Sequence, residues 1–205
     1  MRHSEERIER TKKVEKSNLK RCRWPGADDL MLRYHDKEWG VPAHGERKLF
    51  EFLTLDAFQA GLSWRTILNK RENFREAFDN FDYKKIAGYN QSKIKELMGN
   101  AGIVRNRLKI KAAISNAREF LKIQKEFQSF DKYIWQFTGG RAKQNKWKKM
   151  SQLPPHSRES DAMSRDLKKR GFRFVGSTIC YAFMQAAGMV NDHEITCFRY
   201  KELKR

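Results

Sequence analysis

Apolar residues recur along this chain at steps of three and four positions, and this spacing restricts the fold more than any other feature. One face of a helix is formed, for example, by Leu49, Phe50, Leu53 and Ala57. Runs that alternate apolar and polar residues, which are typical of half-buried strands, are few. The sequence therefore predicts a mainly α fold. The same spacing predicts further helices around residues 64–70, 74–78, 94–98, 110–121 and 133–137.

In the last third of the chain, glycines and a run of basic residues indicate where helices end and where a loop lies. One helix is expected to begin at Ser160-Asp161, whose side chains can cap free backbone N–H groups, and to end at Gly171. A last helix is expected over residues 178–187. Ahead of both, residues 141–149 carry five basic side chains and no acidic one. Because this segment follows two glycines, it is predicted to be an exposed loop or linker.

The composition is that of a globular protein. Of 205 residues, 39 % are hydrophobic and 12 % aromatic, which supplies enough apolar surface for a core. Four prolines and twelve glycines are too few for a collagen-like or low-complexity chain. No segment has the ~18 uninterrupted apolar residues of a membrane-spanning helix. We expect a basic, poorly ordered extension over residues 1–20, without an apolar signal segment, and one domain over residues 21–205.

Positive charge is in large excess. Lysine and arginine outnumber aspartate and glutamate by 44 to 25, which gives a net charge of +19. A protein with this excess associates with polyanions, so the expected partners are DNA, RNA or an anionic membrane surface. Charge alone does not distinguish between them.

Two cysteines and two histidines form a candidate metal site. Cys22 and His35 lie near the start of the chain, and His193 and Cys197 lie four positions apart near its end. Two thiolates and two imidazoles make a tetrahedral zinc set without an open position, so the metal would be structural. It would clip the two ends of the chain together. The alternative is buried cysteines without a metal and surface histidines; Cys180, in an apolar stretch, is expected in the core.

A glycine-containing turn joins two predicted helices between residues 97 and 107. Gly99 and Gly102 are expected to allow left-handed backbone in a tight turn, with the next helix starting at Val104. Free N–H groups at that helix start would form a nest for a phosphate oxygen. The alternative is an ordinary turn with a basic surface. Positive charge would surround the nest from Arg105, Arg107, Lys109 and Lys111.

Aromatic residues gather in the first third of the chain around one carboxylate. Asp56 lies within an apolar helical stretch, and burying a carboxylate without a partner costs several kcal/mol. It is therefore capped, exposed or reserved for a ligand. Aromatic faces with one carboxylate suit a flat cation. In a polycationic protein, a flat cation carried on a polyanion is an alkylated purine in DNA. The aromatic residues concerned are Trp24, Tyr34, Trp39 and Trp64.

Several long motifs in a fixed order identify a family. Between about Cys22 and Cys197 the sequence resembles the DNA-3-methyladenine glycosylase I family of the helix-hairpin-helix superfamily. That family usually carries glutamate where this chain has Asp56, whose side chain is shorter by one methylene, roughly 1.5 Å of reach. The motifs are RYHDKEWGVP at 33–42, QAGLSW at 59–64, KRENF at 70–74, GFRFVG at 171–176, TICY at 178–181 and VNDH at 190–193.

The resemblance implies a fold and a metal. The fold would be that of a helix-hairpin-helix DNA glycosylase, with the hairpin element at about residues 91–121. A structural zinc would join the N- and C-terminal regions. Its ligands would be Cys22, His35, His193 and Cys197.

The resemblance also assigns residues to a base pocket and to DNA. Trp24, Tyr34, Asp56 and Trp64 would bind the base, and the last three would take part in catalysis. Separate residues would hold the DNA, by filling the gap left by the extruded base or by gripping the backbone. These are Gly61 and Leu62 for the gap, and Gly102, Arg105 and Arg107 for the backbone.

The expected activity is hydrolysis of the N-glycosidic bond of 3-methyladenine in double-stranded alkylated DNA, which leaves an abasic site. Two alternatives are a non-enzymatic, zinc-stapled nucleic-acid-binding protein and a glycosylase for a different damaged base. An odd number of cysteines favours a reducing compartment. We expect a monomer that is cytoplasmic, associated with the nucleoid and without a membrane partner.

Overall fold

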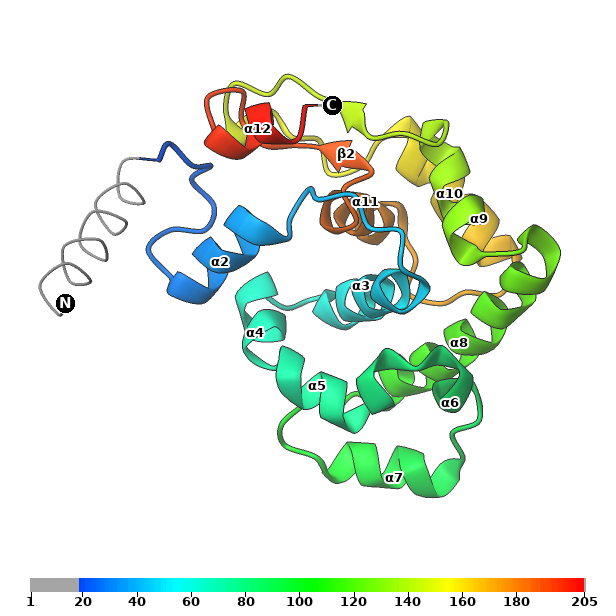
Figure 1. The fold of residues 1–205 in the computed structure, drawn as a ribbon. Helices are drawn as coiled ribbons and strands as arrows, with labels where there is room; N and C mark the ends of the chain where they lie inside the picture. Colours follow the sequence, from blue (N-terminus) through cyan, green and yellow to red (C-terminus); the bar gives the residue numbers. More distant parts are fainter. Residues whose placement is uncertain (1–18, 205) are drawn as a thin grey trace, which may run out of the picture.

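A computed structural model describes residues 19–204, and most of the predicted extension over residues 1–20 lies outside this range. The described chain is predominantly helical, which confirms the predicted fold class (Figure 1). None of the described helices is long and apolar enough to cross a membrane. The helices of four or more residues are α2 (Asp29–Lys37), α3 (Glu46–Gln59), α4 (Trp64–Asn69), α5 (Arg71–Ala77), α6 (Tyr83–Ala87), α7 (Gln91–Gly99), α8 (Arg107–Phe127), α9 (Phe130–Trp135), α10 (Arg158–Lys169), α11 (Ser177–Ala186) and α12 (Phe198–Glu202).

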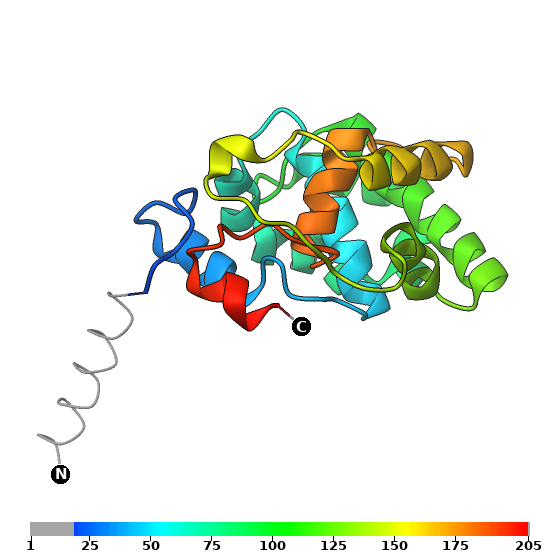
Figure 2. The same cartoon turned by 90° about the horizontal axis from the view of Figure 1, so that it is seen from above.

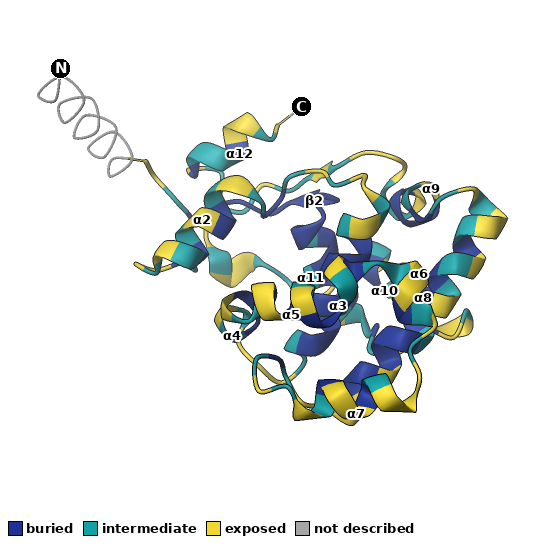
Figure 3. Cartoon of the chain, turned by 60° about the horizontal axis from the view of Figure 1, so that its bottom comes forward, coloured by how far each residue is buried: buried dark blue, intermediate teal, exposed yellow. Residues whose placement is uncertain are grey.

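Helices α3 and α11 lie at the centre of the molecule, where other helices surround them (Figures 1 and 3). Every residue of α3 from Leu49 to Phe58 is buried. A helix that is buried on all sides needs neighbours on all sides, and α3 packs against α4, α8, α9 and α11. The core therefore surrounds the helix that carries Asp56, and it contains Cys180 as predicted.

Helix boundaries follow capping side chains, and one of them differs from the prediction. Helix α10 begins after Ser157, whose hydroxyl accepts a hydrogen bond from the Ser160 backbone N–H at 3.2 Å. The predicted start at Ser160 was wrong, because the Ser160 side chain completes a reciprocal cap with the Ser157 backbone. Helix α11 runs over Ser177–Ala186, close to the predicted 178–187.

The basic segment 141–149 is not a free linker. Its residues Lys143–Gln144 form strand β1, which pairs in parallel with β2 (Val190–Asn191) in a two-stranded sheet. Figure 2 shows the chain after α9 crossing the molecule towards α2 and α12 before it returns to α10. The buried Asp192 carboxylate holds this crossing by accepting hydrogen bonds from the Asn145 amide at 2.7 Å and the Trp147 indole at 2.8 Å.

The connection between α2 and α3 passes directly over the end of α11. A Cβ atom at Gly188 would lie 2.3 Å from the Val41 carbonyl carbon, so only glycine fits there. The backbone N–H of Gly40 donates to the Gln185 carbonyl, and that of Ala43 donates to the Ala187 carbonyl. The N-terminal segment is thereby fixed against the C-terminal part of the core.

Candidate active site and metal centre

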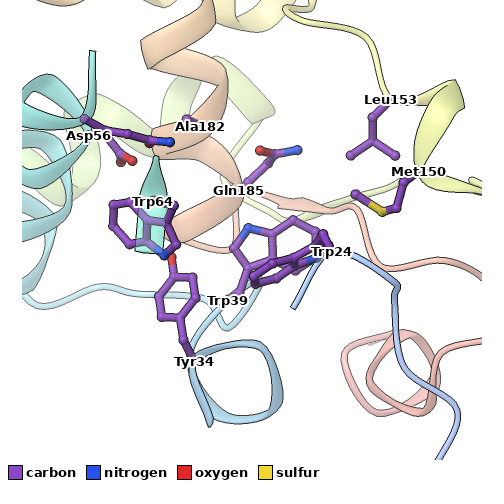
Figure 4. Close-up of a pocket in the computed structure, with 10 residues that line it drawn as sticks. Trp24, Tyr34, Trp39, Asp56, Trp64, Met150, Leu153, Ala182 and Gln185 are labelled. Carbon is purple, nitrogen blue, oxygen red and sulfur yellow. The ribbon is translucent and has the colours of Figure 1, made fainter. Parts of the chain in front are cut away.

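Aromatic side chains and Asp56 converge on one cavity of about 560 Å³, open mouth included (Figure 4). The structure thus brings together the four predicted base-binding residues, Trp24, Tyr34, Asp56 and Trp64. Trp39, which the sequence placed in the same aromatic group, also lines the cavity. The remaining lining residues were not predicted; they are Gln59, Met150, Leu153, Ala182 and Gln185.

Helices α2 and α4 each deliver one aromatic residue to the pocket, and one capping aspartate links the two helices. Tyr34 lies on α2, and Trp64 is the first residue of α4. Asp28 caps α2 by accepting hydrogen bonds from its first N–H groups. The same carboxylate forms an ion pair with Arg65 at 2.8 Å, next to Trp64. This link holds α2 beside α4, and the Tyr34 and Trp64 ring centres lie 5.2 Å apart.

A buried ion cluster fixes the other end of α2. Arg71, on α5, donates to both carboxylate oxygens of Glu38 at 3.0 and 2.9 Å and to Glu51 of α3 at 2.7 Å. Glu38 caps the C-terminal end of α2. Pairing lowers the pKa of both carboxyls despite their burial. Helices α2, α3 and α5 are therefore locked around the pocket by charge as well as by packing.

The pocket holds polar atoms that have no partner. Among the described residues, four buried side-chain nitrogen or oxygen atoms lack a hydrogen bond, and three of them belong to pocket residues. They are one acceptor, Oδ2 of Asp56, and two donors, the indole Nε1 atoms of Trp24 and Trp64. An unsatisfied buried polar group costs about 1–3 kcal/mol. A ligand with a complementary donor and acceptors would remove this cost.

Asp56 is neither exposed nor a helix cap. Its side chain is 2 % exposed, it lies in the interior of α3, and no described residue forms an ion pair with it. Burial raises the pKa of its carboxyl well above the usual range. Burial likewise raises the pKa of Tyr34, and the neighbouring Asp56 adds to that shift. Of the three alternatives drawn from the sequence, a carboxylate reserved for a ligand fits this environment.

The four predicted metal ligands form one buried cluster. The ligand atoms of Cys22, His35, His193 and Cys197 all lie within 4.8 Å of one another. The sulfur atom of Cys22 lies 3.5 Å from Nδ1 of His193, and that of Cys197 lies 3.5 Å from Nε2 of His35. In a tetrahedral zinc site with Zn–S of about 2.3 Å and Zn–N of about 2.0–2.1 Å, a sulfur and a nitrogen are about 3.6 Å apart. The cluster therefore fits a metal ion of this kind.

The outer ring nitrogens of both histidines have acceptors. His35 Nδ1 lies 2.8 Å from the Asp36 carboxylate, which is in turn paired with Arg21. His193 Nε2 lies 3.1 Å from the Trp39 carbonyl. Protons on these outer nitrogens leave the inner nitrogens with free lone pairs, as metal ligation requires.

The cluster and the pocket share walls. Tyr34 and His35 are adjacent on α2, and one faces the pocket while the other faces the cluster. The Trp24 ring centre is 5.5 Å from that of His35, and the Trp39 ring centre is 4.6 Å from that of His193. Ordering the cluster therefore orders two tryptophans of the pocket.

The turn between α7 and α8 differs in detail from the prediction. Helix α8 begins at Arg107, not at Val104, because the Asn106 side chain caps it by accepting from the next N–H groups. Neither Gly99 nor Gly102 adopts the predicted left-handed backbone. Gly102 is closely packed instead, since a Cβ atom there would lie 2.9 Å from the Asn100 side-chain oxygen and 3.1 Å from the Asn73 side chain.

The turn that carries Gly61 and Leu62 follows α3 at the protein surface. Gly61 has a positive φ of 79°, a conformation that glycine adopts at little cost. The Leu62 side chain is 41 % exposed, which is unusual for a large apolar residue in this chain. Lys109 holds this turn in place: its ammonium donates to the carbonyls of Phe58 at 2.9 Å and Ala60 at 2.6 Å. The prediction that Lys109 contributes surface charge to the hairpin was wrong, because the side chain points inward and is buried.

Replacing Lys109 with methionine should destabilise the protein by about 2–4 kcal/mol, because two carbonyls at the end of α3 lose their donor. Urea denaturation measures this loss. Lys111→Met is the matched control on the same helix, where the side chain is exposed, and should change stability little. Equal stability of both variants would contradict the anchoring role.

The family model described as methyladenine glycosylase matches residues 24–200. The chain belongs to the methyladenine glycosylase family. DNA-3-methyladenine glycosylase 1 of Escherichia coli is 46 % identical over 182 residues, which are 89 % of this chain and 97 % of that protein.

Solved structures of family members share the fold. A crystal structure of a 3-methyladenine DNA glycosylase I has a TM-score of 0.85 at 47 % identity and covers 87 % of this chain and 98 % of its own. The Staphylococcus aureus enzyme, whose structure is described as the basis of its 3-methyladenine recognition, has a TM-score of 0.85 at 34 % identity, covering 88 % and 96 %. The fold of this family member is thus that of the solved glycosylases.

Proposed function

We propose that this protein is a DNA glycosylase that hydrolyses the N-glycosidic bond of 3-methyladenine in DNA and leaves an abasic site. One observation carries the proposal: an unpartnered carboxylate oxygen and two unpartnered indole N–H groups meet among aromatic rings in one pocket. A 3-methylated adenine offers a donating amine, accepting ring nitrogens and a positive charge. The related proteins described above carry the same activity in their names.

The pocket would select the base by its charge. Ring faces attract a cation by about 0.5–2 kcal/mol, and more where water is excluded. The Asp56 carboxylate would accept a hydrogen bond from the exocyclic amine of the base, and this bond gains strength from the opposite charges. An unmodified adenine lacks the charge and would bind more weakly.

The chemical step then needs little assistance from the enzyme for departure of the base. Water attacks C1′ of the deoxyribose, and the C1′–N9 bond breaks with its electron pair moving to the base. This pair neutralises the positive charge of the methylated purine, so the base departs as a neutral molecule without prior protonation. The proton of the attacking water is lost to solvent. Two carboxylates of the kind used by sugar glycosidases are therefore not required.

Other residues would hold the DNA while the base is extruded, a step that costs a few kcal/mol of stacking and pairing. The exposed Leu62 side chain, on the turn with Gly61, would fill the gap in the duplex. The turn around Gly102 and the start of α8 would form a helix-hairpin-helix grip, in which free N–H groups face a phosphate. Arg105 and Arg107, both exposed, would add charge to this grip.

A structural zinc ion is part of the proposal. Cys22, His35, His193 and Cys197 would hold it as a closed four-coordinate set. When bound, the ion supplies a cross-link between the two ends of the domain and takes no part in the reaction.

The decisive experiment incubates the protein with duplex DNA treated with a methylating agent and separates the released bases by chromatography. We expect 3-methyladenine as the main product and abasic sites without strand breaks. Release of unmodified adenine at a similar rate would contradict selection by charge. Binding of the DNA without any base release would favour a zinc-stapled nucleic-acid-binding protein, and release of another lesion would favour a different damaged base.

The Asp56 carboxyl should make base release depend on pH. Burial raises the pKa of this carboxyl and so favours its protonated form, whereas a cationic base prefers the ionised form. At enzyme concentrations below saturation, we expect the rate of base release to rise as the pH increases through the pKa of Asp56. Asp56→Asn should release 3-methyladenine about tenfold more slowly, equal to about 1.4 kcal/mol, and without this rise.

The same variant should be more stable than the wild type. Above the ordinary carboxyl pKa of about 4, the unfolded state ionises Asp56 while the folded state resists ionisation, so wild-type stability falls as the pH increases. The stability gain of Asp56→Asn should therefore grow from about pH 4 upward. A variant with the same pH profile as the wild type in both measurements would exclude Asp56 as the titrating group.

A further inference from the structure

We propose that Met150 and Leu153 set the size limit for the alkyl group on N3 of the base. This inference rests on the proposed function, and it assigns a role to two side chains in the segment between β1 and α10. Both line the pocket, and neither had a role in the sequence analysis.

The two side chains face Asp56 across the cavity. Figure 4 shows Asp56 and Trp64 on one side of the pocket and Met150 and Leu153 on the opposite side, with the rings of Trp24 and Trp39 between them. A base that fills the cavity would therefore have one end at the carboxylate and the other end at a thioether and an isobutyl group. The second end has no charged lining residue.

The chemistry of adenine decides which end is which. Its exocyclic amine is attached to C6, and C6 lies directly across the six-membered ring from N3. The amine is the hydrogen-bond donor that the unpartnered Asp56 oxygen requires. With the amine at Asp56, the substituent on N3 points towards Met150 and Leu153. The glycosidic nitrogen N9 lies at this same end. The wall formed by the Met150 and Leu153 side chains therefore stands beside the bond that breaks.

Hydrogen bonds hold this wall in place. The Met150 backbone N–H donates to the Glu194 carboxylate at 3.1 Å, and Glu194 is buried in the loop between two of the metal ligands. The Gln152 side chain accepts from the backbone N–H groups of Lys148 and Lys149. The Leu153 N–H donates to the Met150 carbonyl at 3.0 Å. A fixed apolar wall can exclude a longer group, which a mobile loop would not do.

The two side chains should contribute differently. Methionine is unbranched and adapts its shape, so Met150 should yield to a small increase in alkyl length. Leucine has fewer rotamers and presents a branched surface, so Leu153 should define the firmer limit. We therefore expect a larger change in selectivity from replacing Leu153.

The test measures a ratio of products. Duplex DNA that contains 3-methyladenine and 3-ethyladenine is incubated with each variant under single-turnover conditions, and both released bases are quantified. Met150→Ala and Leu153→Ala should raise the ratio of 3-ethyladenine to 3-methyladenine release at least fivefold above that of the wild type. Met98→Ala on α7, outside the pocket lining, is the control and should leave the ratio unchanged.

A variant that narrows the pocket provides a second test in case the alanine variants do not fold. Leu153→Phe should reduce release of 3-ethyladenine more than that of 3-methyladenine, and its melting temperature reports whether it is folded. An unchanged ratio in folded variants of both kinds, with 3-methyladenine still released, would overturn the assignment. A wild-type protein that releases neither base would instead refute the proposed function, so the two failures are distinguishable.

Discussion

Cys197→Ala should abolish stoichiometric zinc binding and lower the melting temperature by about 10–20 °C. The cluster joins distant parts of the chain, since Cys22 and His193 are 171 positions apart. Cross-linking a loop of about 100 residues contributes about 4.7 kcal/mol in the chain-entropy description. In a protein of this size, about 1 kcal/mol shifts the melting temperature by about 2–4 °C. Metal analysis of the purified protein and thermal unfolding measure the two effects.

Cys180 provides the matched control for the metal site. It is buried outside the cluster, where its thiol donates to the Val175 carbonyl at 3.4 Å. Cys180→Ser keeps a donor at this position and should retain one zinc ion per chain. Equal zinc content in the Cys180 and Cys197 variants would contradict the assignment of the ligands. The Cys197 variant should also lose base release, because Trp24 and Trp39 rest on the histidines of the cluster.

Trp64→Ala should slow release of 3-methyladenine by about 100-fold while changing DNA affinity less than about twofold. The indole contributes a ring face to the pocket, a donor without another partner, and a wall against water. Together these losses amount to about 3 kcal/mol, and each 1.4 kcal/mol is a factor of ten. Single-turnover release and binding to a duplex with an abasic-site analogue measure the two quantities separately.

The conservative variant Trp64→Phe separates the ring face from the donor. Phenylalanine keeps an aromatic face beside Tyr34 but has no N–H group, so its release rate should lie between those of the wild type and Trp64→Ala. A parallel loss of DNA affinity and base release in the alanine variant would show that Trp64 contributes to DNA binding in general. That result would contradict a specific role of Trp64 in binding the base.

Apolar spacing predicted the helices well because most of them bury one face. It located α7 and α8, whose buried residues recur at helical steps, and also α3, which is buried on all sides. Side-chain capping was harder to predict, since Ser157 and Ser160 are both good caps and only the structure shows which one begins α10. The pairing of β1 with β2 had no sequence signal, because each strand has two residues.

The site was predictable where it depends on residue chemistry. Buried carboxylates and clustered aromatic rings are unusual enough to be recognised, and the structure brings Asp56 and its aromatic neighbours together. The roles of Met150 and Leu153 could not be predicted, since a methionine and a leucine that follow a basic segment have no distinctive pattern. Lys109 was misjudged for a related reason: a count of charges does not show that one lysine turns inward to the end of α3.

Burial of all three thiols matters where methylating agents are present. Electrophiles that methylate purines also attack sulfur, and a thiolate is the most nucleophilic side chain that a protein offers. Cys22 is 4 % exposed, and Cys180 and Cys197 are 0 % exposed. The protein thus presents no accessible sulfur of cysteine to the reagents that create its substrate.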